Sequence, residues 1–505
     1  MRETITVQVG QCGNQIGNLF WQLLLLEHEK TPDTDDALSA YFRFEPSGKQ
    51  GNFQTHAMKA RALLIDMECG PLQETMKSPI GSLFDHTQYV MDVSGSGNNF
   101  AHGHYAYGPQ YRSRFEEGLR KNAENCDSLQ TFLVTHSLGG GTGSGVGTYV
   151  LSMLSDLFPK ISRFSACVYP SEDNDVVTSP YNTVLAMKQL VEHADCVFPM
   201  DNSSLFNFSK LETANLNKVV ASNAASSAIN VKEPIVRIGR KDKGFDAINA
   251  VAARMLCNLT SSSRFHGEMN VDLNEIYTNL VPFPKLHFLM TALNIRHPLS
   301  VKDQINRQRA QNNQMAATTS SSKPPPRPKA SDASRVALQR CFSDVFSSRG
   351  QITAGDPTAK GCVTLASAFL ARGEASHVPL SDFLKCVTES TRKHLQFPHW
   401  NQDACKIGMC NTASPGDDVS VLAVYNSTAF SSVLAREHTS FSRLYRKKAM
   451  LHHYTEFVEE KVVAEAEHSL CDLLAEYRAL ESGTFNGKSD LNDEMSPYVQ
   501  LFPAF

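Results

Sequence analysis

The chain has 505 residues, of which 41% are hydrophobic and 20% charged, and its formal net charge is −4. This is ordinary globular composition with length for two or three subdomains, and the small net charge indicates neither nucleic-acid nor membrane binding. Met1 leads directly into the alternating segment ITVQV and no apolar run reaches about 18 residues, so we expect no secretory leader and no membrane span. The 12 cysteines show no paired metal spacing and are expected to be free thiols.

The chain begins with a predicted strand over Thr4–Val9 and a predicted helix that runs from the glycine-containing turn at Gly10 to about His28. Residues 31–60 are polar and lack periodicity, so they are predicted to form a surface loop region.

A buried strand is predicted over Arg61–Glu68, and its last residues include Asp66 and Glu68. Open α/β sheets bind ligands at the carboxyl ends of their strands, and carboxylates are ligands that Mg²⁺ prefers. An isolated Asp-x-Glu is more simply a solvated strand end, so the residues alone leave both interpretations open.

The most informative stretch is Leu138–Gly145, LGGGTGSG, which lies between a predicted strand at Leu129–Thr135 and a predicted helix at Val146–Phe158. Glycines let backbone N–H groups approach an anion, and the following helix N-terminus adds partial positive charge. The pattern therefore predicts a phosphate-binding loop, although it matches neither GxxxxGK[ST] nor GxGxxG. A flexible linker is the alternative, but linkers are rarely flanked by a buried strand and an amphipathic helix.

A second small-residue loop, Ser94–Asn99, follows a short predicted strand at Val90–Val93. Taken alone, these residues could form either a simple turn or another loop that contacts phosphate. Further along, strands and helices alternate as in a parallel doubly wound sheet. The predicted segments are a strand at Arg163–Tyr169, a loop at Pro170–Pro180, a helix at Tyr181–His193 and a strand at Asp195–Met200 that ends in Asp201 and Asn202.

Residues 207–244 have no strong period. They include a basic run that is most simply part of a solvated loop and alternatively a partner site: Lys232, Arg237, Arg240, Lys241 and Lys243. Helical periodicity returns over Phe245–Thr260. Residues 297–335 are Ser/Pro-rich and predicted to be disordered. The remaining predicted elements are strands at Val281–Leu293, Cys362–Ala371 and Val419–Tyr425, helices at Arg335–Ser348 and Leu380–His394, and a helical region at Ala429–Ser482 with basic Arg443, Arg446, Lys447 and Lys448.

The motif GGGTGSG after a strand ending Thr-His-Ser resembles the glycine-rich signature of the tubulin superfamily. Further blocks agree in order: GQCGNQIG at Gly10–Gly17, SGSGNN at Ser94–Asn99, NVDLNEIYTNLVPFPKLHF at Asn270–Phe288 and RLYRKKAMLHHYT at Arg443–Thr455. The chain is identified as a member of this superfamily. The extension at 207–244 and the absence of a long acidic tail resemble the epsilon branch more than alpha or beta.

The resemblance implies a tubulin-like α/β fold in four parts. These are a doubly wound, parallel-sheet GTP-binding domain over 1–244 with an insertion at 207–244, a central helix over 245–262, an intermediate α/β domain over 263–428 with the low-complexity insertion 297–335, and C-terminal helices over 429–505. Because the second insertion falls where tubulins carry a lateral-contact loop, we expect it to hinder ordinary lateral packing.

The resemblance also implies which residues hold GTP or GDP with Mg²⁺. Implied at the phosphates are Gln11, Cys12, Gly97, Asn98, Ser137, Gly140, Gly141, Thr142 and Gly143; at the ribose, Asp175; at the guanine, Gln15, Asn202, Phe245 and Asn249; at the metal, Asp66 and Glu68. Phe245 stands where tubulins carry a tyrosine that stacks on the base.

Asp272 and Glu275 are three residues apart and are expected to share a helix face. The resemblance implies that this segment reaches the nucleotide of a neighbouring subunit, where Glu275 could orient or deprotonate the attacking water. GTP hydrolysis is then expected only across a subunit contact. The implied partners are delta, alpha or beta tubulin and centriolar proteins, and the implied location is the cytoplasmic cytoskeleton at the centriole or basal body, where doublet or triplet microtubules are built or maintained.

Two other functions compete with this one. A self-contained nucleotide enzyme would need a nucleophile or base near its own γ-phosphate, and the sequence has no convincing Ser/His/Asp or Cys/His set. His102 and His104 flank the loop Ser94–Asn99 but are expected to be structural. A capping or scaffold protein that holds nucleotide without hydrolysing it is the other alternative, and Glu275 weighs mildly against it.

Overall fold

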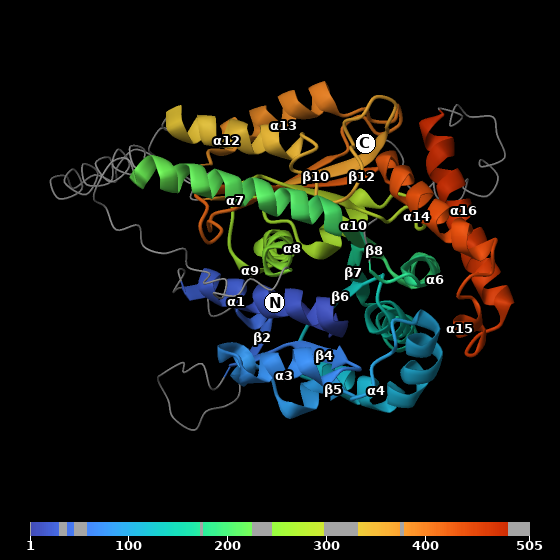
Figure 1. Cartoon of the computed structure of the whole chain (residues 1–505). Coiled ribbons are helices and arrows are strands. Elements are labelled where there is room, and N and C mark those ends of the chain that lie inside the picture. The colour runs from blue at the N-terminus through green and yellow to red at the C-terminus, as the bar shows by residue number, and fades with distance from the viewer. Residues whose placement is uncertain are drawn as a thin grey trace, which may run out of the picture.

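The structure, a computed structural model, describes residues 2–29, 38–44, 58–171, 175–224, 245–296, 332–373 and 378–482. Two β-sheets form its interior, and helices pack around and between them (Figure 1). All 12 cysteines are free, as expected. Within the described part of the chain, no helix combines the length and apolar character needed to cross a bilayer.

The N-terminal sheet has six strands, all parallel. In spatial order they are β5 (Tyr89–Met91), β4 (Ala62–Asp66), β1 (Glu3–Val9), β6 (Leu129–Ser137), β7 (Ser162–Tyr169) and β8 (Cys196–Asp201). Every residue of β1 and β4 is buried, as in parallel sheets covered on both faces. The strand order reverses between β1 and β6, which makes their carboxyl ends the topological switch point where such sheets bind ligands.

Helices cover both faces of this sheet because successive strand residues, which point to opposite faces, are apolar. Ile65 packs into one core with residues of the helices α4, α5 and α6, whereas Leu64 packs into another with α1 and α8. The helices are α1 (Gly10–Glu29), α3 (Cys69–Lys77), α4 (Gly108–Glu124), α5 (Gly147–Leu157), α6 (Ser179–His193), α7 (Asn202–Ala224) and α8 (Asp246–Leu259). Two π-helical segments, η4 (His102–Tyr107) and η5 (Thr142–Val146), directly precede α4 and α5.

The second sheet mixes orientations: β10 pairs in parallel with β11 and antiparallel with β12, which pairs antiparallel with β9. Its strands are β11 (Cys405–Cys410), β10 (Thr364–Gly373), β12 (Val419–Ser427) and β9 (Met290–Leu293). The helices α12 (Asp332–Val345) and α13 (Leu380–His394) lie on its outer side, and α8 lies between it and α1 (Figure 1). The shorter α9 (Ser261–Arg264) and α10 (Leu273–Leu280) follow α8.

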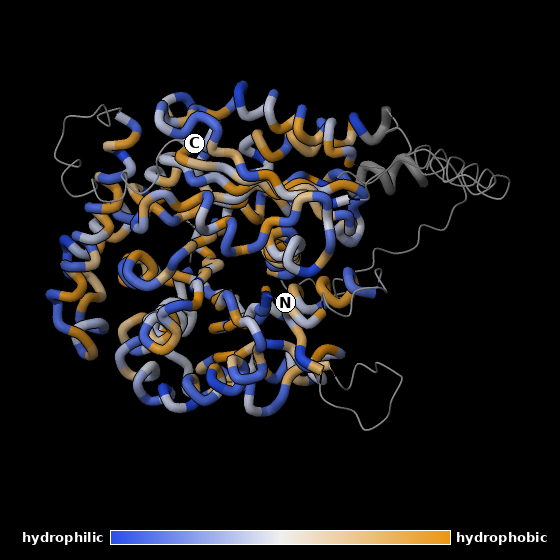
Figure 2. The backbone as a smooth tube through the Cα atoms, turned by 180° about the vertical axis from the view of Figure 1, so that it is seen from behind, coloured by the Kyte–Doolittle hydropathy of each residue, from blue (hydrophilic) through white to orange (hydrophobic). Residues whose placement is uncertain are grey.

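The last helices, α14 (Ser431–Tyr445), α15 (His452–Thr455) and α16 (Glu460–Glu481), form a layer along one side of the molecule, where α14 and α16 pack against α6 (Figure 1). The outer helices are amphipathic. In α13, for example, Phe383, Val387 and Thr391 are buried at spacings of four residues while most of the other positions are exposed or half-buried. Figure 2 shows the hydrophobic and hydrophilic colours alternating along such helices.

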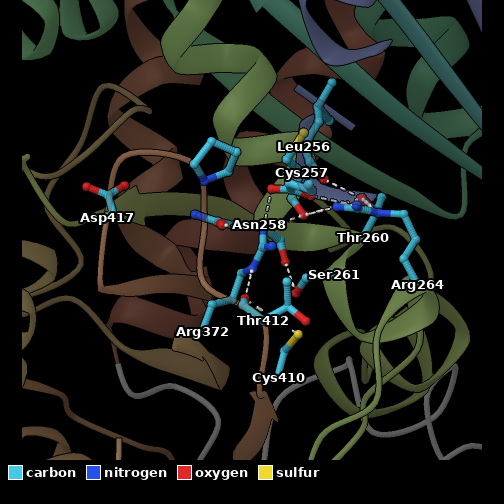
Figure 3. A network of polar contacts seen from close by, with 12 residues as sticks. Leu256, Cys257, Asn258, Thr260, Ser261, Arg264, Arg372, Cys410, Thr412 and Asp417 are labelled. Carbon is cyan, nitrogen blue, oxygen red and sulfur yellow. Dashed lines mark hydrogen bonds and ion pairs between the residues drawn. The ribbon is translucent and has the colours of Figure 1, made fainter. Parts of the chain in front are cut away.

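A buried ionic network joins the two sheets. Arg264 of α9 and Arg372 of β10 both ion-pair with Glu27 of α1, and all three side chains are fully buried. Figure 3 shows both arginines reaching the end of α8: Arg264 donates to the Cys257 carbonyl at 2.7 Å, and Arg372 donates to Asn258 Oδ1 at 3.1 Å. Charged groups this deep are stable only when paired, so the network fixes how the N-terminal and second sheets sit around α8.

Several secondary-structure predictions are wrong. The region 31–60 is not simply a loop, because β2 (Phe42–Phe44) pairs with β3 (Met58–Ala60) and Tyr41 packs on Trp21. The segment after Asn202 is the helix α7 through Ala224, so the 207–244 insertion is helical in its first part.

The strand predicted at Val281–Leu293 is limited to Met290–Leu293, and β11 had not been predicted. Pro282 and Pro284 offer no backbone donor, which confines the strand to the end of that segment. Two further predictions lie outside the described residues: the basic residues of the 207–244 insertion, from Lys232 to Lys243, and the low-complexity segment up to residue 331.

Candidate nucleotide-binding site

A cavity of about 310 Å³ opens at the carboxyl ends of the parallel strands, at the switch point between β1 and β6. Its walls come from segments far apart in the sequence. The lining residues are Gly10, Gln11, Cys12, Gln15, Asp66, Glu68, Ser96, Asn98, Ser137, Gly139, Gly140, Gly141, Thr142, Gly143, Val168, Pro170, Val176, Asn202, Phe245 and Asn249. The size suits a small organic ligand, and two helices begin at its floor, α1 at Gly10 and η5 at Thr142.

The glycine-rich loops meet at the floor of the cavity too closely for side chains. Gly10 has φ +74°, and a Cβ on it would lie 3.0 Å from the backbone nitrogen of Gly143. A Cβ on Gly141 would lie 2.5 Å from the Asn99 backbone nitrogen and 2.5 Å from Ser96 Oγ. The loops therefore present mainly backbone N–H groups and the hydroxyls of Ser96 and Thr142, which lie 3.0 Å apart. Such a surface suits an anion with several oxygens.

Three further lining residues suit a flat polar ring. Phe245 is 59% exposed at the start of α8, so one face of its ring is open for stacking. Asn249, one turn further on, is buried and donates to Gln15 Oε1 at 3.2 Å. Asn202 begins α7 where β8 ends. Amides carry donors and acceptors together, which suits the edge of a purine.

The acidic pair lies at the third side of the cavity. Asp66 Oδ1 accepts from the Glu68 backbone N–H at 3.3 Å, whereas Asp66 Oδ2 is buried without a hydrogen-bond partner. Burial, reinforced by the charge of Glu68, raises the pKa of Asp66 to about 7. An unpaired, buried carboxylate oxygen that faces a phosphate-type loop fits a divalent cation shared with the ligand, because Mg²⁺ in proteins takes few side-chain ligands and completes its shell with phosphates and water. No cluster of three or more His, Cys, Asp or Glu side chains suited to a metal occurs among the described residues.

Comparisons with known proteins agree with this geometry. Residues 3–210 match the family model described as "Tubulin/FtsZ family, GTPase domain". The chain is 42% identical to the mouse tubulin epsilon chain over 498 residues, which cover 95% of this chain and 97% of the mouse protein. The chain belongs to the tubulin family. It is 41% identical to the human tubulin epsilon chain over 495 residues, again with 95% and 97% coverage. Identity to the beta chain of Porphyra purpurea is 32% over 501 residues, with 97% and 95% coverage.

Membership of the tubulin family implies guanine-nucleotide binding, and most of the residues that the sequence placed at the nucleotide line this cavity. Gly97 and Asp175 do not line it: Gly97 lies in the same loop as Asn98, and Asp175 is exposed beside Val176. The sequence reasoning missed the lining residues Gly10, Ser96, Gly139, Val168, Pro170 and Val176. Ser96 could have been assigned to the site from the sequence, since it belongs to the small-residue loop Ser94–Asn99.

Asp272 and Glu275 lie outside this cavity, as the tubulin resemblance implied. The expectation that they share a helix face is wrong, because Asp272 precedes α10 as its N-cap and accepts from the Glu275 backbone N–H at 2.6 Å. Asp272 also ion-pairs with Arg2, and Glu275 lies 2.6 Å from Lys406 Nζ. The half-exposed carboxylate of Glu275 is thus held by a lysine of β11.

The histidines near the cavity support the loops and do not line it. His136 is fully buried beneath the glycine loop, where Nδ1 donates to the Gly143 carbonyl at 2.9 Å and Nε2 accepts from Ser165 at 2.8 Å. Burial lowers the pKa of His136 to about 4 and that of His104 to about 4, so both rings are neutral. Burial also raises the pKa of Cys12 to about 12, so this thiol is not an activated nucleophile.

Proposed function

We propose that this tubulin-family chain binds GTP with Mg²⁺ and acts through subunit contacts as a cytoskeletal protein of the epsilon type. The observation that carries the proposal is the convergence of the phosphate-type loops with Phe245, Asn202 and Asn249 around one open cavity. Asp66 and Glu68 would hold the cation, directly or through water, and the cation would supply positive charge beside the phosphates.

The proposed cellular role rests on the resemblance of this chain to the epsilon branch. Both the mouse and the human relatives are epsilon chains, and the resemblance of this chain to that branch supports a role at the centriole or basal body, in assembling or maintaining doublet or triplet microtubules. Other tubulins (delta, alpha or beta) and centriolar proteins would be the partners there.

Hydrolysis, in this proposal, requires a second subunit. Among the described residues that line the cavity there is no histidine, and the only thiol there, Cys12, stays protonated. Glu275 would act on a nucleotide that the neighbouring subunit presents to the α10 surface. Turnover should therefore rise steeply with protein concentration or with added tubulin.

One observation favours the alternative, a nucleotide-holding capping or scaffold protein. Glu275 is already engaged by Lys406 at 2.6 Å, and a carboxylate held in this ion pair has to leave the lysine before it can act on a water molecule. Nucleotide binding without turnover at any protein concentration, with or without added tubulin, would support this second function.

The direct test is to denature the purified protein and identify the released nucleotide, and then to titrate the emptied protein with GTP and ATP, each with Mg²⁺ and with EDTA. We expect guanine nucleotide in the supernatant, preference for GTP over ATP, and weaker GTP binding in EDTA. Equal, weak affinity for ATP and GTP together with no released nucleotide would reject the proposal. Asp66→Asn, which keeps the shape of the side chain and removes its charge, should abolish most of the difference between Mg²⁺ and EDTA.

A further inference from the structure

We propose that Asn182 and Tyr454 form a clamp that positions the phosphate loops of the nucleotide site and ties them to the C-terminal helical layer. Neither residue lines the cavity, and neither touches the nucleotide in the proposed function, on which this inference rests. Both are therefore positioning residues.

Asn182, in α6, uses both ends of its amide on the two loops. Its Nδ2 donates to the Asn98 carbonyl at 2.8 Å and to the Gly139 carbonyl at 2.8 Å. Its Oδ1 accepts from the Phe100 backbone N–H at 2.9 Å. The side chain is fully buried. One amide thus joins the loop Ser94–Asn99 to the loop Leu138–Gly145.

The orientation of these bonds matters for anion binding. In a planar trans peptide the C=O and the following N–H point in opposite directions. Because Asn182 holds the Gly139 carbonyl on its own side, the Gly140 N–H is directed away from Asn182, toward the cavity that Gly140 lines. Losing the clamp would free this peptide to rotate, and the N–H would no longer be preorganised for a phosphate oxygen.

The second loop needs support for another reason. Asn98 has φ +52°, a left-handed conformation that costs a non-glycine residue free energy. Its carbonyl is held both by Asn182 Nδ2 and by Thr178 Oγ1, the latter at 3.2 Å. The backbone conformation of Asn98 is therefore maintained by α6 and the turn before it, and not by the loop alone.

Tyr454 connects this arrangement to the C-terminal layer. Its hydroxyl donates to Asn182 Oδ1 at 2.6 Å and also lies 3.1 Å from the Thr178 carbonyl. Its ring packs on Tyr181, with the centroids 5.0 Å apart, and is fully buried. A second link runs beside it, since Asn99 Nδ2 donates to the His453 carbonyl at 2.8 Å. The α15 segment thus reaches the phosphate loops in two ways. Tyr454 acts through Asn182 of α6, 272 residues away in the chain, and the His453 carbonyl accepts directly from Asn99, 354 residues away.

The test measures GTP and guanosine affinities side by side, because a clamp on the phosphate loops should affect only the phosphate part of the ligand. Tyr454→Phe keeps the ring packing and removes the hydroxyl, and Asn182→Ala removes the whole clamp. The matched control is Tyr425→Phe. Tyr425 lies in β12 of the second sheet, and its buried hydroxyl donates to the Val345 carbonyl of α12 at 3.2 Å. All proteins are titrated in full length with Mg²⁺, and thermal unfolding is recorded for each.

We expect Tyr454→Phe to weaken GTP binding by roughly threefold to tenfold, the effect of one hydrogen bond, and Asn182→Ala to weaken it more. Guanosine affinity should be unchanged in both variants. Tyr425→Phe should change neither the GTP affinity nor the guanosine affinity. If Asn182→Ala does not fold, Tyr454→Phe decides the question.

If the variants lose GTP affinity and guanosine affinity equally, or lose neither, the proposed clamp is wrong. Guanine-nucleotide binding by the wild type would still stand. A wild-type protein that binds neither ligand would overturn the proposed function and the clamp together. Loss confined to GTP in Tyr454→Phe is the result that establishes the clamp.

Discussion

Glu27 and Arg372 are 345 positions apart in the chain, yet Oε1 of Glu27 lies 2.7 Å from Nη1 of Arg372. The other carboxylate oxygen of Glu27 accepts from Arg264 at 2.5 Å. Burial alone would raise the pKa of Glu27, but the two guanidinium groups hold it below its ordinary value. One carboxylate thus neutralises an arginine from the second sheet and another from the segment after the central helix.

Removing this carboxylate should strongly destabilise the fold. Glu27→Ala leaves two buried guanidinium groups without a counter-charge, and we expect it to lower the free energy of unfolding by about 3–5 kcal/mol. Glu117→Ala, which removes an exposed carboxylate paired with Arg120, serves as the control and should lower the free energy of unfolding far less, because solvent screens this pair. Urea unfolding followed by circular dichroism measures both. Similar small losses in the two variants would show that the buried network does not hold the sheets together.

Asn202 should contribute to guanine recognition. Asn202→Ala leaves a purine donor or acceptor unsatisfied in the cavity, and we expect GTP affinity to fall by about 1–3 kcal/mol. The weak affinity for ATP should be unchanged, so the ratio of GTP affinity to ATP affinity should fall. Calorimetric titration with both nucleotides is the measurement, and Asn215→Ala, on the same helix but outside the cavity lining, is the control. A parallel loss of ATP and GTP affinity would contradict a role in reading the base.

Glu275 should act on a nucleotide held by another subunit. Glu275→Ala should leave the affinity of this chain for its own GTP nearly unchanged, because the side chain lies outside the cavity and pairs with Lys406. In complexes with added tubulin it should slow hydrolysis by about a hundredfold to ten-thousandfold, the usual contribution of a general base. The exposed Glu268 in the same segment provides the matched control, Glu268→Ala. A large loss of affinity in the isolated variant with unaltered GDP content in the complex would reject the assignment.

His136 should make stability fall in mild acid. Burial lowers its pKa to about 4 in the folded chain, whereas the unfolded chain binds the proton near pH 6.5. The stability that the neutral ring contributes is complete above pH 6.5 and is lost progressively as the pH falls toward 4. Between pH 6.5 and 5.5 this loss is about 1 kcal/mol.

The measurement compares thermal unfolding at pH 7.5 and 5.5 in wild type, His136→Gln and the control Tyr425→Phe, which removes a buried hydroxyl and no histidine. Wild type and Tyr425→Phe should lose more stability in acid than His136→Gln does. The same pH dependence in all three proteins would show that His136 is not the group responsible.

Much of the cavity could be predicted from the sequence because its parts are encoded locally. A strand, a glycine-containing turn and a helix follow one another within one short stretch at Thr4–His28 and again at Leu129–Phe158. The alternation of strands and helices implies a parallel sheet. Parallel strands place their carboxyl ends on one edge, so the loops after β1, β4, β6 and β8 had to meet there.

Other features depend on contacts between distant segments and leave no local signal. Tyr41 is buried against Trp21, and the adjoining β2 pairs with β3, in a region whose composition is typical of a polar loop. α7 continues to Ala224 although its sequence has little amphipathic character. Asp272 caps α10 instead of sharing its face with Glu275, because a carboxylate that precedes the first turn can accept the N–H three residues on.

The sequence by itself determined the family, the parallel sheet and most residues around the cavity, since motif order, periodicity and strand–turn–helix units are properties of short stretches. Only the tertiary structure decided that Asn182 holds two loops at once, that Tyr454 reaches it from the C-terminal layer, and that Glu27 pairs with Arg372. A buried asparagine, tyrosine or glutamate has the same local pattern whatever its partner is. Its partner is selected by the free-energy cost of leaving a buried polar group unpaired, and that cost arises only once the chain has folded.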